Sequence, residues 1–569
     1  MRTRRKPTKR RIRLPGALIA AALSSLPATP SLAQTGDSDS VTNRLIELLV
    51  KRGVLQRDDA NALLAEAKAE KKKPAKLAAK PASPEKPAAE AAVPSGTVRV
   101  TYVPQFVRDQ IAQQVRDDLL QQASQPGAAP AVPPPGWLDR FHLFGDLRIR
   151  GELDQFAKSN GTLFPDFATI NNGSAFDVTG TGGEPPLLDT TQNRARERLR
   201  ARAGVDVDID DGIMAEIRIA TGNDGSPVTS NQTFGQNGPF TKYAIWLDRG
   251  FVKAAPNDWL TAYAGRMPNP FWTTDLIYYD DLGFDGFAAS VTPHFDKRWS
   301  GFVTAGAFPV FNTALNFGST DGNAGFASRN AWLLAVQAGG KWQATEDIST
   351  RLAAGYFDYS NISGKLSSPC TIVYSSDTCN TDASRTLFPG NGNTLLPIRD
   401  ILQAPNNTQP QYFGLATPFH ILDIHSQLNL DMFRPVGVSF DTEFAINLGF
   451  NRGRVDALGS NNFAANASQP DAGNKAGMIR VNVGAPVIAE RWDWNMSLAY
   501  KYIESDSVLA SLNDPDFHLG GTNAKGFILA ANLGIARNTW LTAKWFSSTQ
   551  VSGQPYAVDV IQADLNVKF

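Results

Sequence analysis

The chain has 569 residues, its 55 Lys and Arg are balanced by 55 Asp and Glu, and 42% of its residues are hydrophobic. Its mean hydropathy is −0.24. After residue 33, no uninterrupted stretch has the roughly twenty apolar residues that a membrane-spanning helix needs. This excludes a helical membrane protein, so strands would have to do any spanning.

Residues 1–33 are predicted to be a secretory signal peptide. They carry eight Lys or Arg and no acid, then an apolar stretch from Leu14 to Leu26, then Ser31-Leu32-Ala33, which fits a small-x-small cleavage site. An uncleaved anchor is the alternative, but the apolar stretch is short for a bilayer. Cleavage leaves 47 basic against 55 acidic residues, a net charge of −8. This acidic balance argues against nucleic acid as a partner.

Residues 34–136 are predicted to form a small periplasmic α-helical region. We expect a helical hairpin over 34–70, an Ala/Pro/Lys-rich linker over 71–97, and an amphipathic helix with a Pro-rich connector over 98–136. The third helix would begin at Pro104 and carry one apolar stripe. That stripe needs a partner, either the rim of a barrel or the same helix of other subunits in a coiled coil.

The next feature is a ladder of arginines. Every second residue from 194 to 202 is arginine (Arg194, Arg196, Arg198, Arg200 and Arg202), whereas the intervening residues, apart from Glu197, are apolar or small. A period of two is typical of a strand. In a soluble sheet the arginines would meet water, and in an outer-membrane barrel they would line a channel.

Similar alternation continues to the end of the chain and predicts about sixteen antiparallel strands in a transmembrane β-barrel over 137–569. The predicted strands are 143–153, 194–209, 213–221, 241–253, 259–265, 283–292, 299–310, 331–342, 348–360, 419–432, 437–451, 476–488, 491–503, 525–537, 540–547 and 556–569.

The predicted connections alternate between tight and long, as in outer-membrane barrels with short periplasmic turns and long outer loops. Tight ones such as Asp210-Asp211-Gly212 have turn chemistry. A soluble all-β protein is the alternative, but it has no reason to place a long loop at every second connection. The final strand ends in an aromatic residue, Phe569. Such a terminus looks like the signal that outer-membrane barrels present to the barrel assembly machinery.

Several segments together resemble the "putative porin" family of Gram-negative outer-membrane proteins. They are Val98 to Asp118, Gly145-Asp146-Leu147-Arg148-Ile149-Arg150, the arginine ladder, Gly265-Arg266-Met267-Pro268-Asn269-Pro270-Phe271, and Phe284-Asp285-Gly286. The resemblance implies a β-barrel channel for small solutes in the outer-membrane lipid. Likeness to sixteen-stranded porins also implies a homotrimer.

A porin selects solutes by pore width and by the field at its constriction, which is often made by an inward-folded third loop. The third long connection here is predicted to be Arg266 to Leu282. Its acids would be Asp275, Asp280 and Asp281, with Asp285 just beyond. We expect them to face a basic wall formed by the ladder together with Arg148, Arg150 and Arg218. The alternative is that the arginines mainly pair with loop carboxylates and hold the loop in place.

The cysteines and histidines are the remaining candidates for chemistry. Cys370 and Cys379 lie nine residues apart in the longest loop and should form a disulfide in an oxidising compartment. The five histidines (His142, His294, His420, His425 and His518) are scattered and form no catalytic or metal motif. We therefore expect no enzyme activity, cofactor or metal. A second hypothesis is a structural barrel that anchors the envelope to peptidoglycan, or to a periplasmic partner, through its N-terminal helices.

Overall fold

The computed structural model describes residues 138–180, 183–222, 225–236, 238–293, 295–313, 329–375, 377–458 and 472–569. The predicted signal peptide, helical hairpin, linker and amphipathic helix, residues 1–136, lie outside the described residues. In the described ranges, no helix is long and apolar enough to cross a membrane.

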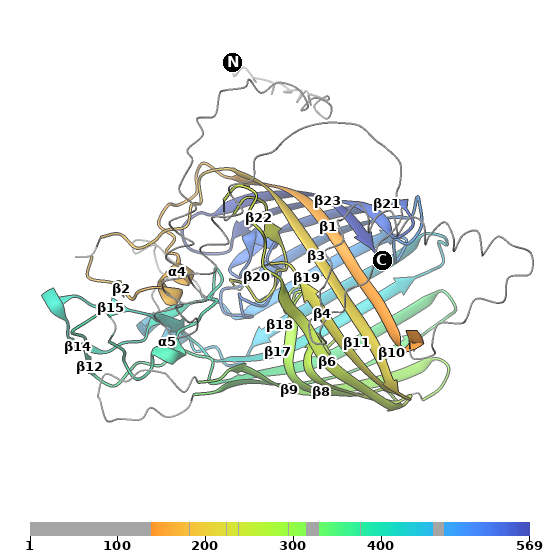
Figure 1. Cartoon of the computed structure of the whole chain (residues 1–569), viewed down its shortest axis with the longest axis horizontal. Coiled ribbons are helices and arrows are strands. Elements are labelled where there is room, and N and C mark those ends of the chain that lie inside the picture. The colour runs from red at the N-terminus through yellow and green to blue at the C-terminus, as the bar shows by residue number, and fades with distance from the viewer. Residues whose placement is uncertain are drawn as a thin grey trace, which may run out of the picture. The chain divides into compact units, whose positions relative to one another are not determined.

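Sixteen strands of the described residues pair in an antiparallel ring that closes on itself (Figure 1). They are β1 (Phe141–Phe156), β3 (Arg194–Asp210), β4 (Ile213–Ala220), β6 (Trp246–Asn257), β7 (Leu260–Pro268), β8 (Gly283–Val291), β9 (Trp299–Phe311), β10 (Ala331–Gln343), β11 (Ile348–Ser360), β17 (Phe419–Leu430), β18 (Gly437–Asn447), β19 (Lys475–Gly484), β20 (Trp494–Ile503), β21 (Ala524–Ala536), β22 (Thr539–Gln550) and β23 (Ala557–Lys568). The ring closes where β1 pairs with β23, from Asp146 opposite Lys568 to Phe156 opposite Val558. The predicted sixteen-stranded barrel is confirmed.

Most strand boundaries follow the alternation closely, but the strands predicted over 437–451 and 476–488 end four residues earlier, at Asn447 and Gly484, and a third strand is shifted at both ends. The strand predicted over 241–253 lies at Trp246–Asn257. Its pairing partner β4 ends at Ala220, which lies opposite Trp246, so residues before Trp246 have no strand edge to join. The neighbouring stretch of β3 pairs instead with the two-residue strand β5 (Gln232–Thr233).

Smaller elements lie in the long connections. They are the helices α4 (Phe167–Asn172) and α5 (Arg452–Leu458), and the short strands β2 (Phe176–Asp177), β12 (Cys370–Thr371), β13 (Leu395–Pro397), β14 (Ile401–Gln403), β15 (Pro410–Gln411) and β16 (Phe413–Leu415). The described residues also form four 3₁₀ turns, η1 (Leu138–Arg140), η2 (Asp382–Ser384), η3 (Pro405–Asn407) and η4 (Phe517–Leu519).

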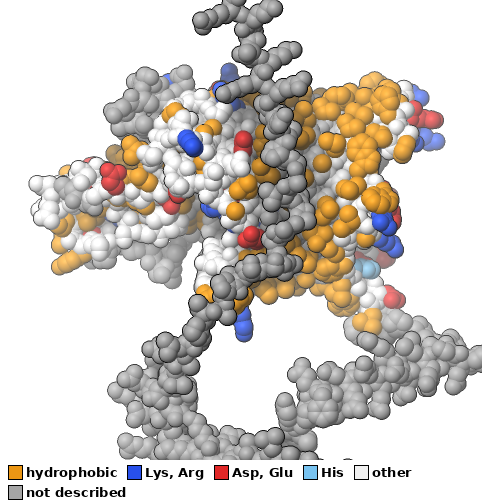
Figure 2. All heavy atoms as spheres, turned by 90° about the horizontal axis from the view of Figure 1, so that it is seen from above, with side chains coloured by type: hydrophobic (Ala, Val, Ile, Leu, Met, Phe, Trp, Pro, Cys, Tyr) orange, Lys and Arg blue, Asp and Glu red, His pale blue; other side chains and the backbone are white. Residues whose placement is uncertain are grey.

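The two faces of each strand differ as the sequence alternation requires. On β1, the side chains of Leu143 and Ile149 point outward and are 84% and 42% exposed, whereas Arg150 and Asp154 point inward and are buried. Hydrophobic side chains cover the outer face of the strands in a broad band, and the end that carries the long loops is mostly polar (Figure 2). This is the surface of a barrel that sits in lipid.

Candidate functional site

The inner face of β1, β3 and β4 forms a wall of paired charges, which we call the arginine wall. It consists of Arg148, Arg150, Arg194, Arg196, Arg198, Arg200, Arg202 and Arg218, all of which the alternation places inside. The exposed fraction of the ladder side chains falls along β3 from 49% at Arg194 to 14% at Arg202.

Carboxylates of the neighbouring strand β1 pair with most of the ladder. Asp154 accepts from Arg194 at 2.7 Å, and Glu152 accepts from Arg196 at 2.5 Å. Asp146 lies 3.0 Å from Arg200 and 2.7 Å from Arg202. These acids have the same parity as Arg148 and Arg150, so the cross-strand register places them beside the ladder. The sequence prediction considered loop acids and missed these strand acids, although their parity was visible.

Arg150 is the most enclosed member of the arginine wall. Its guanidinium donates to both carboxylate oxygens of Asp564 on β23, at 2.8 and 2.9 Å, and to Asp516 at 2.9 Å. Its side chain is fully buried. Removing one partner of such a buried pair typically costs about 3–5 kcal/mol, because the remaining charge is left uncompensated.

The charges of the wall nearly cancel. Seven of its eight arginines contact seven carboxylates: Asp146, Glu152, Asp154, Asp248, Asp281, Asp516 and Asp564. Arg148 instead donates to the amide oxygen of Asn231 at 2.6 Å. The eight arginines and the carboxylates they contact therefore form a set of oriented ion pairs with one more arginine than carboxylate.

The third long loop begins later than the sequence predicted. Residues Gly265–Pro268 still pair with Gly283–Gly286 of β8, so the loop runs from 269 to 282. Arg266 is thus a β7 residue and Asp285 a β8 residue, and neither belongs to the loop. They lie opposite each other, and Arg266 donates to Asp285 at 2.9 Å.

Two local features lie on either side of the point where the strands end and the loop begins. Gly265 and Gly286 are paired across β7 and β8 and have φ of 118° and 144°, which L side chains rarely adopt. Asn269 then accepts from the backbone N–H of Phe271 at 3.0 Å and donates to Thr273 at 2.9 Å. These bonds form a compact turn at the start of the loop.

The loop crosses the interior of the barrel. Near its start, the Trp272 ring stacks on His425 of β17, with centroids 3.8 Å apart. At its end, Asp281 bridges Arg200 and Arg202 of β3, at 3.1 and 2.7 Å. Strands β3 and β17 lie eight strands apart in either direction around the ring, so they face each other across the interior.

The middle of the loop is tied to a third part of the barrel. Asp275 accepts from Arg480 of β19 at 2.7 Å and from Lys501 of β20 at 3.0 Å. Although burial opposes ionisation, Arg480 and Lys501 hold the pKa of the Asp275 carboxyl below its usual value. Burial likewise opposes ionisation of Asp281, but Arg200, Arg202 and Arg148 lower its pKa. Asp280, between these two, is exposed.

One face of the loop packs against an apolar wall, which we define as the inner faces of β8, β9, β10 and β11. Leu276, Ile277 and Tyr278 are at most 2% exposed. The Tyr278 ring lies edge-on to Phe357 of β11 at 5.3 Å, and its hydroxyl is 2.7 Å from that of Tyr359. Burying each large apolar side chain contributes about 1.5–3 kcal/mol, so these contacts hold the loop firmly against the apolar wall.

A second loop, residues 504–523, also reaches the interior. Its Asp514 accepts from Lys501 at 2.9 Å, and its Asp516 binds Arg150. Its backbone carbonyl at Leu512 accepts from the N–H of Tyr279 at 2.9 Å. The sequence prediction assigned no role to these acids, since no local pattern distinguishes them from those of an ordinary polar loop.

Two other predicted features have clear positions. Cys370 and Cys379 are joined by a disulfide, with their Cα atoms 5.9 Å apart, in the connection between β11 and β17. Phe569 follows β23, exchanges two backbone hydrogen bonds with Gly145 of β1, and keeps its side chain 68% exposed.

Comparison with known proteins decides the family. The family model described as "Putative porin" matches residues 39–569. The chain belongs to the putative porin family. This membership and the closed barrel indicate an outer-membrane channel.

The chain resembles several solved outer-membrane proteins at low sequence identity and low TM-score. They include the outer-membrane channel DcaP of Acinetobacter baumannii, with 9% identity over 75% of this chain and 97% of that one and a TM-score of 0.35. OprB of Pseudomonas putida has 11% identity over 76% and 96%, with a TM-score of 0.39. OmpF of Salmonella typhi, in a complex with daunomycin, has 9% identity over 75% and 97%, with a TM-score of 0.34. No curated protein matches the chain by sequence. Sequence identities and TM-scores this low do not indicate which solute the chain transports.

Proposed function

We propose that this porin is a diffusion channel for small hydrophilic solutes and ions, with its constriction between the arginine wall and loop 269–282. The observation that carries the proposal is the bridge from Asp281 to Arg200 and Arg202. It holds one end of an interior loop against the charged wall, while Leu276, Ile277 and Tyr278 of the same loop pack on the apolar wall. Solutes would then pass beside the paired charges rather than through the apolar half.

The near-neutral charge of the wall supports weak anion selectivity. Oppositely charged groups fixed in rows create a transverse field, which orients dipolar solutes, while the excess of one positive charge gives little overall preference. The half-exposed Arg194 at one end of the ladder supports an anion preference at that mouth.

Single-channel recording tests the proposal. The purified mature protein is placed in planar bilayers, and conductance and reversal potential under a salt gradient are compared with those of the variant Arg196→Ala/Arg198→Ala/Arg200→Ala. We expect large ohmic steps whose weak anion preference falls in the variant. Arg434→Ala, which removes an exposed charge at a short turn, is the matched control and should leave selectivity unchanged.

The opposite result is equally clear. A folded, heat-modifiable barrel that does not conduct would overturn the channel and favour the envelope anchor. Deletion of residues 42–120 separates these two functions, because a channel keeps conducting without that region whereas an anchor loses its association with the cell wall.

We also propose the assembly and orientation that the family resemblance implies. The short turns and the N-terminal region would face the periplasm, after removal of residues 1–33, and three copies would associate. Phe569 would serve as the signal to the barrel assembly machinery. Cross-linking of the purified protein and protease accessibility in intact cells test these assignments.

A further inference from the structure

A cavity of about 360 Å³ lies at the end of the barrel that carries the long loops. It is bounded by β8 to β11 and by the loops 361–418 and 504–523. Its volume falls within the range of roughly 300–1,000 Å³ that is usual for small-molecule sites. The arginine wall and its ion pairs do not line it, so it is a separate feature of the channel mouth.

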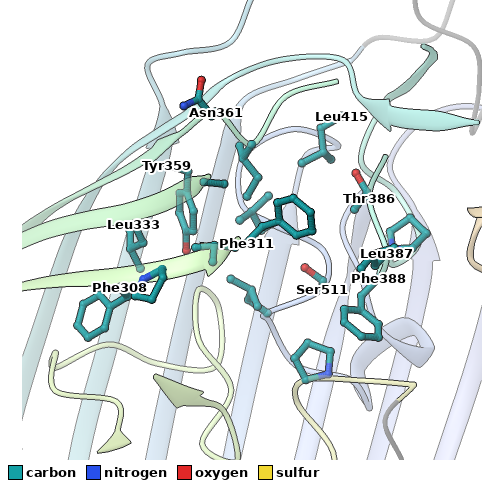
Figure 3. Close-up of a pocket in the computed structure, with 18 of the residues that line it drawn as sticks. Phe308, Phe311, Leu333, Tyr359, Asn361, Thr386, Leu387, Phe388, Leu415 and Ser511 are labelled. Atoms are coloured by element: carbon teal, nitrogen blue, oxygen red, sulfur yellow. The ribbon is translucent and has the colours of Figure 1, made fainter. Parts of the chain in front are cut away.

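The lining of the cavity is largely apolar and aromatic. Phe311 lies between Tyr359 and Leu333 on one side and Leu387 and Phe388 on the other (Figure 3). Phe308 and Leu415 complete this surface. Aromatic faces and edges arranged in this way favour a planar ring, because ring pairs gain from edge-to-face and offset contacts beyond the area they bury.

The charged groups of the cavity are unbalanced. Four cations line it, Arg266, Arg329, Lys365 and Arg385, against one acid, Asp285. Asp285 already pairs with Arg266. The Lys365 ammonium donates to the amide oxygen of Asn361 at 3.3 Å, and the Arg385 guanidinium donates to the backbone carbonyls of Asn171 and Asp382. These partners are neutral, so among the described lining residues the cavity carries an excess of three positive charges.

The cavity also adjoins the constriction. A second cavity of about 290 Å³ shares Pro227, Arg266 and Phe388 with it and is also lined by Asp248 and Asp281. Asp281 is the residue that bridges the arginine wall. The two cavities are therefore adjacent, and the second is lined by the residue that bridges the arginine wall.

We propose that the cavity binds aromatic carboxylates, with the ring against Phe311 and Phe388 and the carboxylate near Lys365, Arg329 and Arg385. A purely apolar ligand leaves the excess charge unmatched, an aromatic amine adds to it, and a small aliphatic acid leaves the rings uncovered. A ligand with both a ring and an acidic group such as a carboxylate matches both halves of the lining. That this ligand is also a transported solute rests on the proposed function. Its binding to the cavity does not, because binding requires no conduction.

Equilibrium binding to the full-length protein, folded in detergent, tests the site. Benzoate, benzylamine and acetate are titrated by calorimetry or ligand-observed NMR. We expect benzoate to bind at least tenfold more tightly than either of the others. Binding of benzylamine as tight as that of benzoate would overturn the proposal.

Two variants and a control locate the ligand. Lys365→Gln should weaken benzoate binding about two- to fivefold, as for a partly exposed ion pair. Phe311→Ala should weaken it about tenfold through the lost ring contact. Lys475→Gln removes an exposed lysine at the same end of the barrel, outside the cavity, and should change nothing. Wild-type affinity in both cavity variants, with heat-modifiable migration showing that they are folded, would refute the site.

Failure of the site and failure of the channel are distinguishable. Protein that binds benzoate in detergent but does not conduct in bilayers refutes the channel and retains the site. Protein that conducts but binds no benzoate refutes the site alone.

Discussion

In both the arginine wall and the apolar wall, every second side chain of a strand points outward. The two walls differ in the side chains that point into the barrel. The arginine wall offers guanidinium and carboxylate groups, most of which already pair across neighbouring strands. The apolar wall offers rings and aliphatic side chains such as Phe357 and Leu333. Loop 269–282 contacts both walls, through Tyr278 on one side and Asp281 on the other. The comparison teaches that lipid constrains only the outer face of a barrel, while the inner face decides where solvent can pass.

Loss of Arg150 should have the largest effect on the charged side. Arg150→Ala leaves Asp564 and Asp516 without this partner inside the barrel. We expect the free energy of unfolding, measured by urea titration in detergent, to fall by about 3–5 kcal/mol. Arg434→Ala is the control, because it removes a pair whose arginine is 70% exposed, and it should cost at most about 1 kcal/mol. Equal costs in both variants would contradict the burial of Arg150.

The apolar side should respond nearly as strongly to a cavity. Leu276→Ala removes a fully buried side chain from the loop face that packs on β8 to β11. The free energy of unfolding should fall by about 2–5 kcal/mol, and this loss should not depend on salt. Leu402→Ala, at a position 71% exposed in another loop, should cost less than about 0.5 kcal/mol. If added salt changes the Leu276→Ala loss, the two walls do not differ in the way we describe.

Acid should weaken the contact of loop 269–282 with the arginine wall and leave its contact with the apolar wall unchanged. Arginines lower the folded-state pKa of Asp281, so its stabilising effect is complete above its unfolded-state pKa of about 3.9 and is lost as pH falls through the lower folded-state value. Asp281→Asn should reproduce the acid state at neutral pH, with a loss of about 1.5–3 kcal/mol. Urea titration at several pH values checks this. A wild-type loss of this pairing between pH 5 and 7 would contradict the ion pair.

The smallest effect concerns the hydroxyl pair on the apolar side. Tyr278→Phe removes one partner of the 2.7 Å contact with Tyr359. The free energy of unfolding should fall by about 1 kcal/mol. Tyr359→Phe and the double variant complete a cycle in which the two single losses are not additive. Additive losses would show that the hydroxyls do not form one hydrogen bond.

The sequence was sufficient to predict the barrel but only part of its interior. Alternation identifies the parity of a strand, and the arginines of β3 showed which parity faces inward. The run from Ala331 to Val336 in β10 is apolar on both faces, which signals burial on both sides. The alternation predicts a barrel strand over 331–342 and assigns no character to its inner face, so it does not predict the apolar wall.

The partners of the charged residues were harder to predict. Asp146, Glu152 and Asp154 lie beside the ladder because of the register between β1 and β3, which alternation alone does not fix. Asp516 meets Arg150 through a contact that joins residues 366 positions apart. No local pattern encodes such a contact.

The pair between Arg150 and Asp564 also bears on how the chain folds. It joins two strands that are 414 positions apart, across the seam where the ring closes. Contacts of such high sequence separation form late and slow folding. Until β23 arrives, β1 has a free edge and its inward arginine lacks its bidentate partner. When β1 and β23 meet, their backbone pairing and the ion pair between Arg150 and Asp564 form together. Both favour the closed ring over an open sheet of the same strands.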